Sequence, residues 1–194
     1  MARARLDAVE SDDIMSDGGK KLFSIAQGEQ LEFPITLNFL DSVEGYSFDA
    51  AAVEALNVAG QTEQPVAIEP AGLKTLLSVR VPVDRGAWGA AEAYTQGQFV
   101  LHEGIYYHLQ YGVNRVSSTE PADDPLWIVT KPNNVYVQIP AALGSTYSVQ
   151  PTVGSPIYAF LELKVQEPVD ALYQRTWKPV RGVIEMLFSP VDVV

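Results

Sequence analysis

The feature that most constrains this chain is a concentration of aromatic residues between positions 88 and 127. Aromatic residues make up 10% of the 194-residue chain, yet seven of them fall within these forty positions. They are Trp88, Tyr94, Phe99, Tyr106, Tyr107, Tyr111 and Trp127. Each large ring buries much apolar surface, so the stretch has enough material for a small core of its own.

The order of apolar and polar residues in this stretch predicts a three-stranded sheet. Residues 98–101 and 105–111 alternate as strands do, and the dipeptide Glu103-Gly104 between them is typical of a tight turn. A polar run from Gly112 to Asp124 leads to a short third strand at 126–129.

The same residues resemble the small carbohydrate-binding modules of families 5 and 12, which are known from chitinases. The resemblance covers about a fifth of the chain and rests on Trp88, Tyr94, Gly97, Gln98, Val100, Gly104, Tyr106, Pro121 and Trp127. Two positions depart from the family pattern. Gln98 stands where the modules usually carry Asp, and Leu109-Gln110-Tyr111 stands where they carry adjacent exposed aromatic residues. The resemblance therefore implies the scaffold more directly than it implies sugar binding.

The resemblance also implies two roles for the aromatic side chains: some would bind sugar and others would form the core. Pyranose rings present flat C–H faces that stack on exposed aromatic side chains. Because alternation sends Tyr107 to the opposite face from Tyr106, the candidate glycan-binding residues are Tyr107, Tyr111 and Trp127. The expected core of the module consists of Trp88, Tyr94 and Tyr106. The alternative is that exposed rings contact a protein neighbour.

Composition narrows the class of protein. The chain has no cysteine, so it has neither disulfides nor thiolate chemistry. It contains no apolar run of membrane-spanning length, and its first residues do not resemble an export signal. The net charge of −11 repels phosphate backbones, so we expect no nucleic-acid partner.

Outside the aromatic stretch the pattern predicts strands separated by Gly, Pro and Asn turns. Residues 1–21 are acidic with few large apolar groups and predict an extended arm or a disordered tail. Residues 50–56 fit either a helical turn or a strand. The expected strands are 22–26, 31–39, 65–68, 75–83, 134–139, 157–166 and 175–188.

These segments predict an all-β protein, an immunoglobulin-like β-sandwich with the three-stranded aromatic-rich module inserted in a loop. The expected domains are an N-terminal arm at 1–21, a sandwich formed by 22–86 plus 131–194, and the inserted module at 87–130. Gly182 lies within the last expected strand and indicates a bulge or bend.

The expected sandwich has a resemblance of its own. Residues 23–29 (FSIAQGE), with the alternating strand after them, and residues 158–165 (YAFLELKV) resemble the N-terminal immunoglobulin-like domain of tailed-phage baseplate upper proteins and related virion accessory proteins. This resemblance implies a structural protein of the virion. Its partners would be other virion proteins and copies of itself.

Catalytic motifs are absent from the sequence. The only histidines, His102 and His108, lie in expected strands without a surrounding motif, and Asp123-Asp124 lacks the spread of oxygen ligands that calcium needs. Glu162 and Glu185 could form a carboxylate pair, but alternation predicts that they face solvent or an interface. We therefore expect no enzyme, no cofactor and no metal.

Taken together, the two resemblances imply a phage virion structural protein of tail, baseplate or head that displays a glycan-binding-like module for host attachment. One alternative is a purely architectural decoration or connector protein, and another is a free-standing secreted lectin. Tyr173 and the segment Trp177-Lys178-Pro179 either cap the sandwich core or form part of a contact with another subunit, where Arg175 or Arg181 would be typical anchors. The near-neutral last third beside an acidic first third is compatible with head-to-tail or cyclic assembly.

Overall fold

A computed structural model describes residues 6–7, 21–55, 74–110, 112, 115–116, 119–142, 151–168 and 175–189. The prediction of an all-β protein is confirmed, and these residues contain no α-helix. Accordingly, no helix in this part of the chain could cross a membrane. The strands are β1 (Leu6–Asp7), β2 (Lys21–Ala26), β3 (Leu31–Thr36), β4 (Ser47–Ala55), β5 (Lys74–Arg80), β6 (Val83–Ala87), β7 (Ala93–Tyr94), β8 (Gln98–His102), β9 (Ile105–Leu109), β10 (Arg115–Val116), β11 (Trp127–Val129), β12 (Asn134–Ile139), β13 (Ile157–Gln166) and β14 (Thr176–Leu187).

The chain divides into two compact units. Unit 1 consists of Met1–Ile35, Gly45–Val79 and Val137–Val194, and unit 2 consists of Thr36–Glu44 and Arg80–Tyr136. Unit 2 is therefore larger than the stretch 87–130 expected from the sequence. It also takes in a segment from before β4, which the expected boundaries assign to the sandwich.

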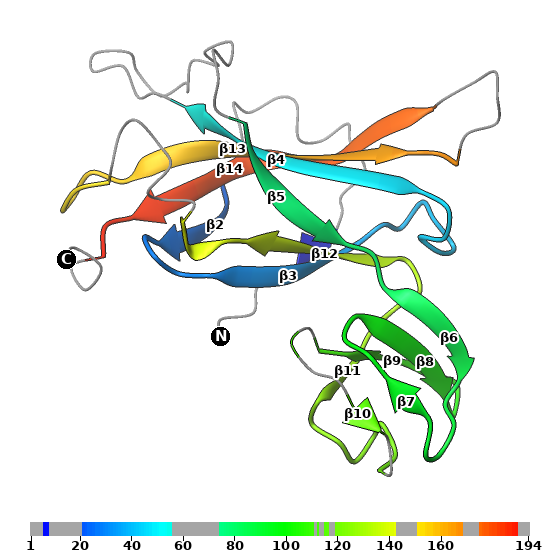
Figure 1. The fold of residues 1–194 in the computed structure, drawn as a ribbon. Helices are drawn as coiled ribbons and strands as arrows, with labels where there is room; N and C mark the ends of the chain where they lie inside the picture. The colour runs from blue at the N-terminus through cyan, green and yellow to red at the C-terminus, as the bar shows by residue number, and fades with distance from the viewer. Residues whose placement is uncertain are drawn as a thin grey trace. The chain divides into compact units, whose positions relative to one another are not determined.

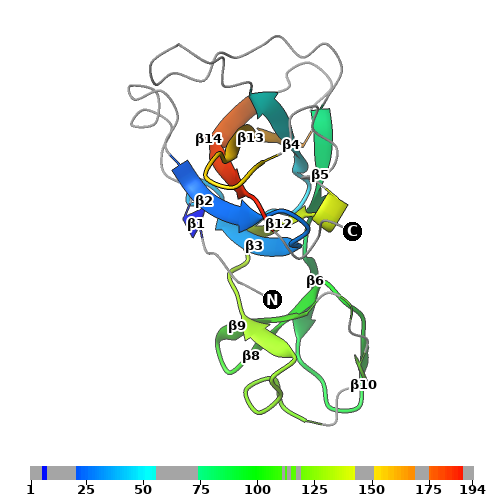
Figure 2. The ribbon, with the colours of Figure 1, turned by 90° about the vertical axis from the view of Figure 1, so that its left-hand side faces the viewer.

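The strands of unit 1 form one eight-stranded sheet in the order β1-β3-β12-β5-β4-β13-β14-β2 (Figure 1). Strand β13 pairs antiparallel with β14 and with β4, and β4 pairs antiparallel with β5, whereas β14 pairs parallel with β2. The sheet curls so that β2 returns beside β3 (Figure 2). The rings of Phe23 and Phe33 are accordingly 5.0 Å apart, edge to face. The two halves of the curled sheet face each other as a β-sandwich, as predicted.

Period-2 alternation accounts for the core of unit 1. In β3, Leu31, Phe33 and Ile35 are buried, and the residues between them are only partly covered. In β13, Leu161, Leu163 and Val165 are fully buried in the same way. Successive side chains of a strand point to opposite faces, so each strand contributes one apolar row to the space between the halves.

Of residues 50–56, for which the sequence left a helical turn or a strand open, residues 50–55 belong to strand β4 and Leu56 lies outside the described residues. Alanine favours helices, but β4 lies between β13 and β5, and strand pairing outweighs that weak preference. Ala50 and Ala52 point inward and are buried. The expected strand 65–68 lies outside the described residues, and so does the expected arm 1–21, apart from β1 and Lys21.

A bulge in β14 explains how this strand tolerates a proline. Leu163 pairs with Val180, whereas Val165 pairs with Trp177, so β14 has one extra residue opposite Lys164. Pro179 lies in that interval. Proline has no N–H to donate to the ladder and is found in sheets mainly at edges and bulges.

Gly182, expected at a bulge or bend, keeps regular register with Leu161 across to β13. On the β2 side the register shifts one residue further on, because Val183 pairs with Lys21 and Ile184 with Phe23, which leaves Leu22 as the extra residue. A Cβ atom at Gly182 would lie 2.5 Å from Cγ of Leu22, well inside van der Waals contact. The missing side chain thus makes room for Leu22 of the neighbouring strand β2.

We expect Gly182→Ala to lower the free energy of unfolding by about 1–3 kcal/mol, because the added methyl group overpacks the Leu22 site. Urea denaturation measures the change. Leu22→Ala in the same chain removes the clash, so the double variant should lose less stability than the sum of the two single variants. Strictly additive losses would contradict this explanation.

Unit 2 contains a four-stranded sheet in the order β11-β9-β8-β6 rather than the expected three-stranded one. The expected strands at 98–101, 105–111 and 126–129 are present as β8, β9 and β11 with slightly different ends. The additional strand, β6, runs parallel to β8, and Val83 pairs with Gln98. Its residues are all exposed, so they lack the alternation that identifies a strand in a sequence. A separate two-stranded sheet pairs β7 with β10.

Candidate functional site

The candidate site lies in unit 2, which has a core of its own. Five side chains form it, namely Tyr94, Val100, Tyr107, Leu109 and Trp127. The rings of Tyr94 and Trp127 meet edge to face, with centroids 5.3 Å apart. Trp88 and Leu126 are partly buried and pack against this core.

Two of the three candidate glycan-binding residues are buried, contrary to the expectation. Tyr107 is 7% exposed and Trp127 is 5% exposed, so neither offers a ring face to a sugar in solvent. The reason lies in the register, because Tyr107 is the cross-strand partner of the core residue Val100 and Trp127 is the partner of Leu109. Tyr111, the third candidate, lies outside the described residues.

The residues expected in the core have different outcomes. Tyr94 is fully buried at its centre, and Trp88 is half-buried at its margin. Tyr106 lies on the other face of β9, half-buried, with its ring 5.6 Å from that of Phe99. Alternation correctly separates Tyr106 from Tyr107, but it does not reveal which of the two faces inward.

Trp88 follows β6 directly and is the half-exposed ring at the edge of the core. Its backbone N–H donates to the carbonyl of Leu101 over 2.9 Å, which fixes the main chain beside β8. Its ring meets His102 edge to face, with centroids 5.0 Å apart. The Trp88 indole therefore packs against the core of unit 2 and against the His102 imidazole.

The turn after Trp88 is held by the hydroxyl of a core residue. The backbone N–H of Gly89 donates to the Tyr94 hydroxyl over 2.8 Å. Two residues on, Ala91 has φ of 66°, a left-handed conformation that costs a non-glycine residue about 1–2 kcal/mol. A strained turn persists only when its surroundings over-determine it, and the Tyr94 hydroxyl supplies part of that constraint.

Two contacts between polar or charged side chains involve neighbours of Trp88 in the chain or in space. Arg85 lies 3.9 Å from a carboxylate oxygen of Glu92, which packs directly over Gly89. His102 Nε2 lies 3.6 Å from a carboxylate oxygen of Glu120. An aromatic plate beside hydrogen-bonding groups can bind a ligand that has both apolar faces and hydroxyls.

A buried polar network in unit 2 has no counterpart in the sequence predictions. The Asn134 side chain accepts a hydrogen bond from the Thr36 hydroxyl over 2.8 Å and donates to the Thr130 hydroxyl over 3.2 Å. The Thr130 hydroxyl is also 2.8 Å from that of Tyr136. In the sequence, the only local sign of this network is the polar pair Asn133-Asn134 at the start of an apolar strand.

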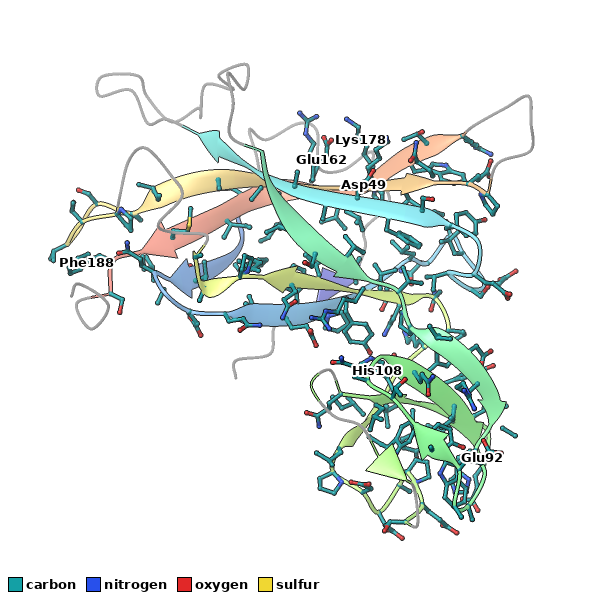
Figure 3. The ribbon with its side chains drawn as sticks, viewed as in Figure 1. Asp49, Glu92, His108, Glu162, Lys178 and Phe188 are labelled. Atoms are coloured by element: carbon teal, nitrogen blue, oxygen red, sulfur yellow. The ribbon has the colours of Figure 1, made fainter. Side chains whose placement is uncertain are left out.

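The two histidines lie on opposite faces of the small sheet. His102 faces Trp88, whereas His108, labelled in Figure 3, is buried and stacks on Tyr136 with ring centroids 4.3 Å apart. Each is thus packed against an aromatic ring. The described geometry does not bring them together as an acid–base pair.

The acidic residues that suggest chemistry in the sequence have structural partners. A side-chain oxygen of Asp124 accepts a hydrogen bond from the N–H of Leu126 over 3.1 Å, which shapes the turn into β11. Glu162 pairs with Lys178, and Glu185 accepts a hydrogen bond from Ser24. Arg181, the cross-strand partner of Glu162, lies four residues from Glu185 along β14. At the rise of a strand, this separates the main chains of the two glutamates by roughly 13 Å.

With a different partner for each carboxylate, the described geometry does not bring Glu162 and Glu185 together as a glycosidase pair. No group of three or more His, Asp or Glu side chains in the described part of the chain could hold a metal ion.

The chain matches none of the protein-family models and none of the curated proteins with which it was compared.

Tyr94→Phe should lower the free energy of unfolding by about 1 kcal/mol, because it removes the hydroxyl that the Gly89 N–H reaches while keeping the ring in the core. Chemical denaturation measures the loss, and amide hydrogen exchange at Gly89 should become faster. Tyr106→Phe serves as the matched control. Equal effects of the two variants would show that the Tyr94 hydroxyl has no special role.

Glu103→Asn should raise the free energy of unfolding by about 0.5–1 kcal/mol. Glu103 begins the β8–β9 turn with φ of 49°, and Gly104 follows with φ of 79°, so Asn-Gly suits this turn better than Glu-Gly. Glu44→Asn is the matched control, since Glu44 also precedes a glycine but is not among the residues with positive φ. A stability gain in the control alone would contradict the argument.

Proposed function

We propose that this chain is a structural protein of a tailed-phage particle and that unit 2 is displayed to bind glycans on the host surface through Trp88. In this proposal the chain binds rather than catalyses and uses no cofactor. Its partners are other virion proteins and copies of itself. Many copies on one particle convert weak single-site affinity into useful attachment.

The observation that carries the glycan part of the proposal is the setting of Trp88. Its ring is half-buried on the core, braced by His102 and followed by a turn that the Tyr94 hydroxyl holds. A ring held in place before binding loses little conformational entropy when a sugar stacks on it. The pairs Arg85–Glu92 and His102–Glu120 supply polar groups nearby for sugar hydroxyls.

The virion part of the proposal rests on the resemblance of residues 23–29 and 158–165 to virion accessory proteins. These residues fall on β2 with its following turn and on β13, which lie in one curled sheet. A sandwich of this kind offers a broad surface for attachment to a particle.

The test is binding of the full-length protein, displayed at high density, to a glycan array and to chitin. Trp88→Leu keeps an apolar group against the core but removes the ring, so we expect single-site affinity to fall about tenfold, with a larger loss at high density. Tyr106→Leu, a half-buried ring on the opposite face of the sheet, should leave binding unchanged. Equal binding by wild type and Trp88→Leu would exclude Trp88 as the sugar contact.

A second candidate function, purely architectural, is favoured by a different observation. Of the eight large apolar side chains that are exposed among the described residues, six belong to unit 2. They are Phe39, Val81, Val83, Leu101, Ile105 and Val129. Each of these side chains is a possible point of contact with another protein. Absence of glycan binding at every display density would favour this function over the first.

A further inference from the structure

Two exposed carboxylates in the surroundings of Trp88 accept no hydrogen bond from the described residues. Glu120 is 58% exposed, and a carboxylate oxygen lies 3.6 Å from His102 Nε2. Glu92, labelled in Figure 3, is 55% exposed, and its carboxylate lies 3.9 Å from the Arg85 guanidinium. Both distances exceed that of a hydrogen bond, about 2.7–3.2 Å. The two carboxylates can therefore accept hydrogen bonds from a ligand without first losing one from these residues.

Each carboxylate is connected to Trp88 through one intervening residue. The His102 ring that Glu120 approaches packs edge to face against Trp88, with centroids 5.0 Å apart. The Glu92 side chain packs over Gly89, the residue after Trp88, where an added Cβ would lie 3.0 Å from the Glu92 Cδ. Trp88 itself is half-buried. A ligand stacked on the accessible part of this ring therefore has carboxylates among its nearest charged neighbours.

The overall charge of unit 2 favours the same kind of ligand. Its sequence contains eight acidic and four basic side chains, which give a net charge of −4. A negative field attracts cationic ligands and repels anionic ones. Sugars that carry carboxylate, sulfate or phosphate groups are therefore disfavoured, whereas sugars that carry a positive charge are favoured.

We infer that the glycan site around Trp88 selects sugars with unsubstituted amino groups. This inference rests on the proposed glycan-binding role of Trp88 and names the class of sugar that it takes. The apolar face of the sugar stacks on Trp88, and the ammonium group donates to the carboxylate of Glu120 or Glu92. Such a charge-assisted hydrogen bond is about twice as strong as one between neutral groups, and tryptophan is the ring that attracts cations best. N-acetylation of the amine removes both contributions.

The test compares binding of the full-length protein, displayed at high density, to oligomers of equal length and linkage. The oligomers consist of glucosamine, N-acetylglucosamine, glucose or glucuronic acid. At neutral pH and low salt we expect the glucosamine oligomer to bind about tenfold more tightly than the two uncharged oligomers, and the glucuronic acid oligomer to bind most weakly. Added salt should reduce these differences.

Glu120→Gln and Glu92→Gln keep the shape of each side chain and remove its charge. At least one of them, and the double variant more strongly, should lower the preference for the glucosamine oligomer severalfold, with unchanged binding of the uncharged oligomers. Glu44→Gln is the matched control, because Glu44 is an exposed carboxylate in the separate segment 36–44 of unit 2. Melting temperatures confirm that every variant is folded.

The outcomes separate this inference from the proposed function. A glucosamine oligomer that binds no better than the uncharged ones would overturn the inference but leave the glycan-binding role of Trp88 intact. So would a preference that survives in the double variant. Absence of binding to every oligomer and to the glycan array would overturn both.

Discussion

Unit 2 depends on a small set of buried hydrogen bonds around Asn134. Its side chain joins the hydroxyls of Thr36 and Thr130, from chain segments 98 and 4 residues away. Two further hydrogen bonds join Leu37 and Asn133. The main-chain N–H of Leu37 donates to the carbonyl of Asn133, and the side-chain amide of Asn133 donates to the carbonyl of Leu37. A buried polar group left without such a partner costs about 1–3 kcal/mol, so these bonds specify which segments meet. They explain why residues 36–44 belong to unit 2.

The small size of unit 2 determines what its aromatic residues can do. A short stretch has little volume for a core, so large rings are the most effective way to fill it. Tyr94, Tyr107 and Trp127 fill the core in this way, and because they are buried they cannot contact a ligand. Trp88, at the margin of the core, keeps part of its ring accessible. Tyr94 has a second role, because its hydroxyl holds the turn that follows Trp88.

Strand alternation in unit 1 separates buried apolar side chains from exposed charged ones. The inward rows of β3 and β13 are apolar and buried, whereas the outward row of β13 and β14 carries a network of Glu162, Lys178 and Arg181. Such exposed ion pairs contribute little to stability, so this face can change its charges without loss of the fold. Trp177 at the start of β14 belongs to the inward row, because it pairs with the buried Val165, and its ring lies 6.3 Å from that of Tyr46.

The sequence by itself determined the all-β class and the bounds of β12 and β13, because alternation and turn residues act locally. Only the tertiary structure decided which rings of unit 2 face inward. The period of a strand separates Tyr106 from Tyr107, but the cross-strand partner Val100 selects the buried one. The exposed parallel strand β6 and the recruitment of residues 36–44 were likewise decided by contacts between distant segments, which leave no periodic trace in the sequence.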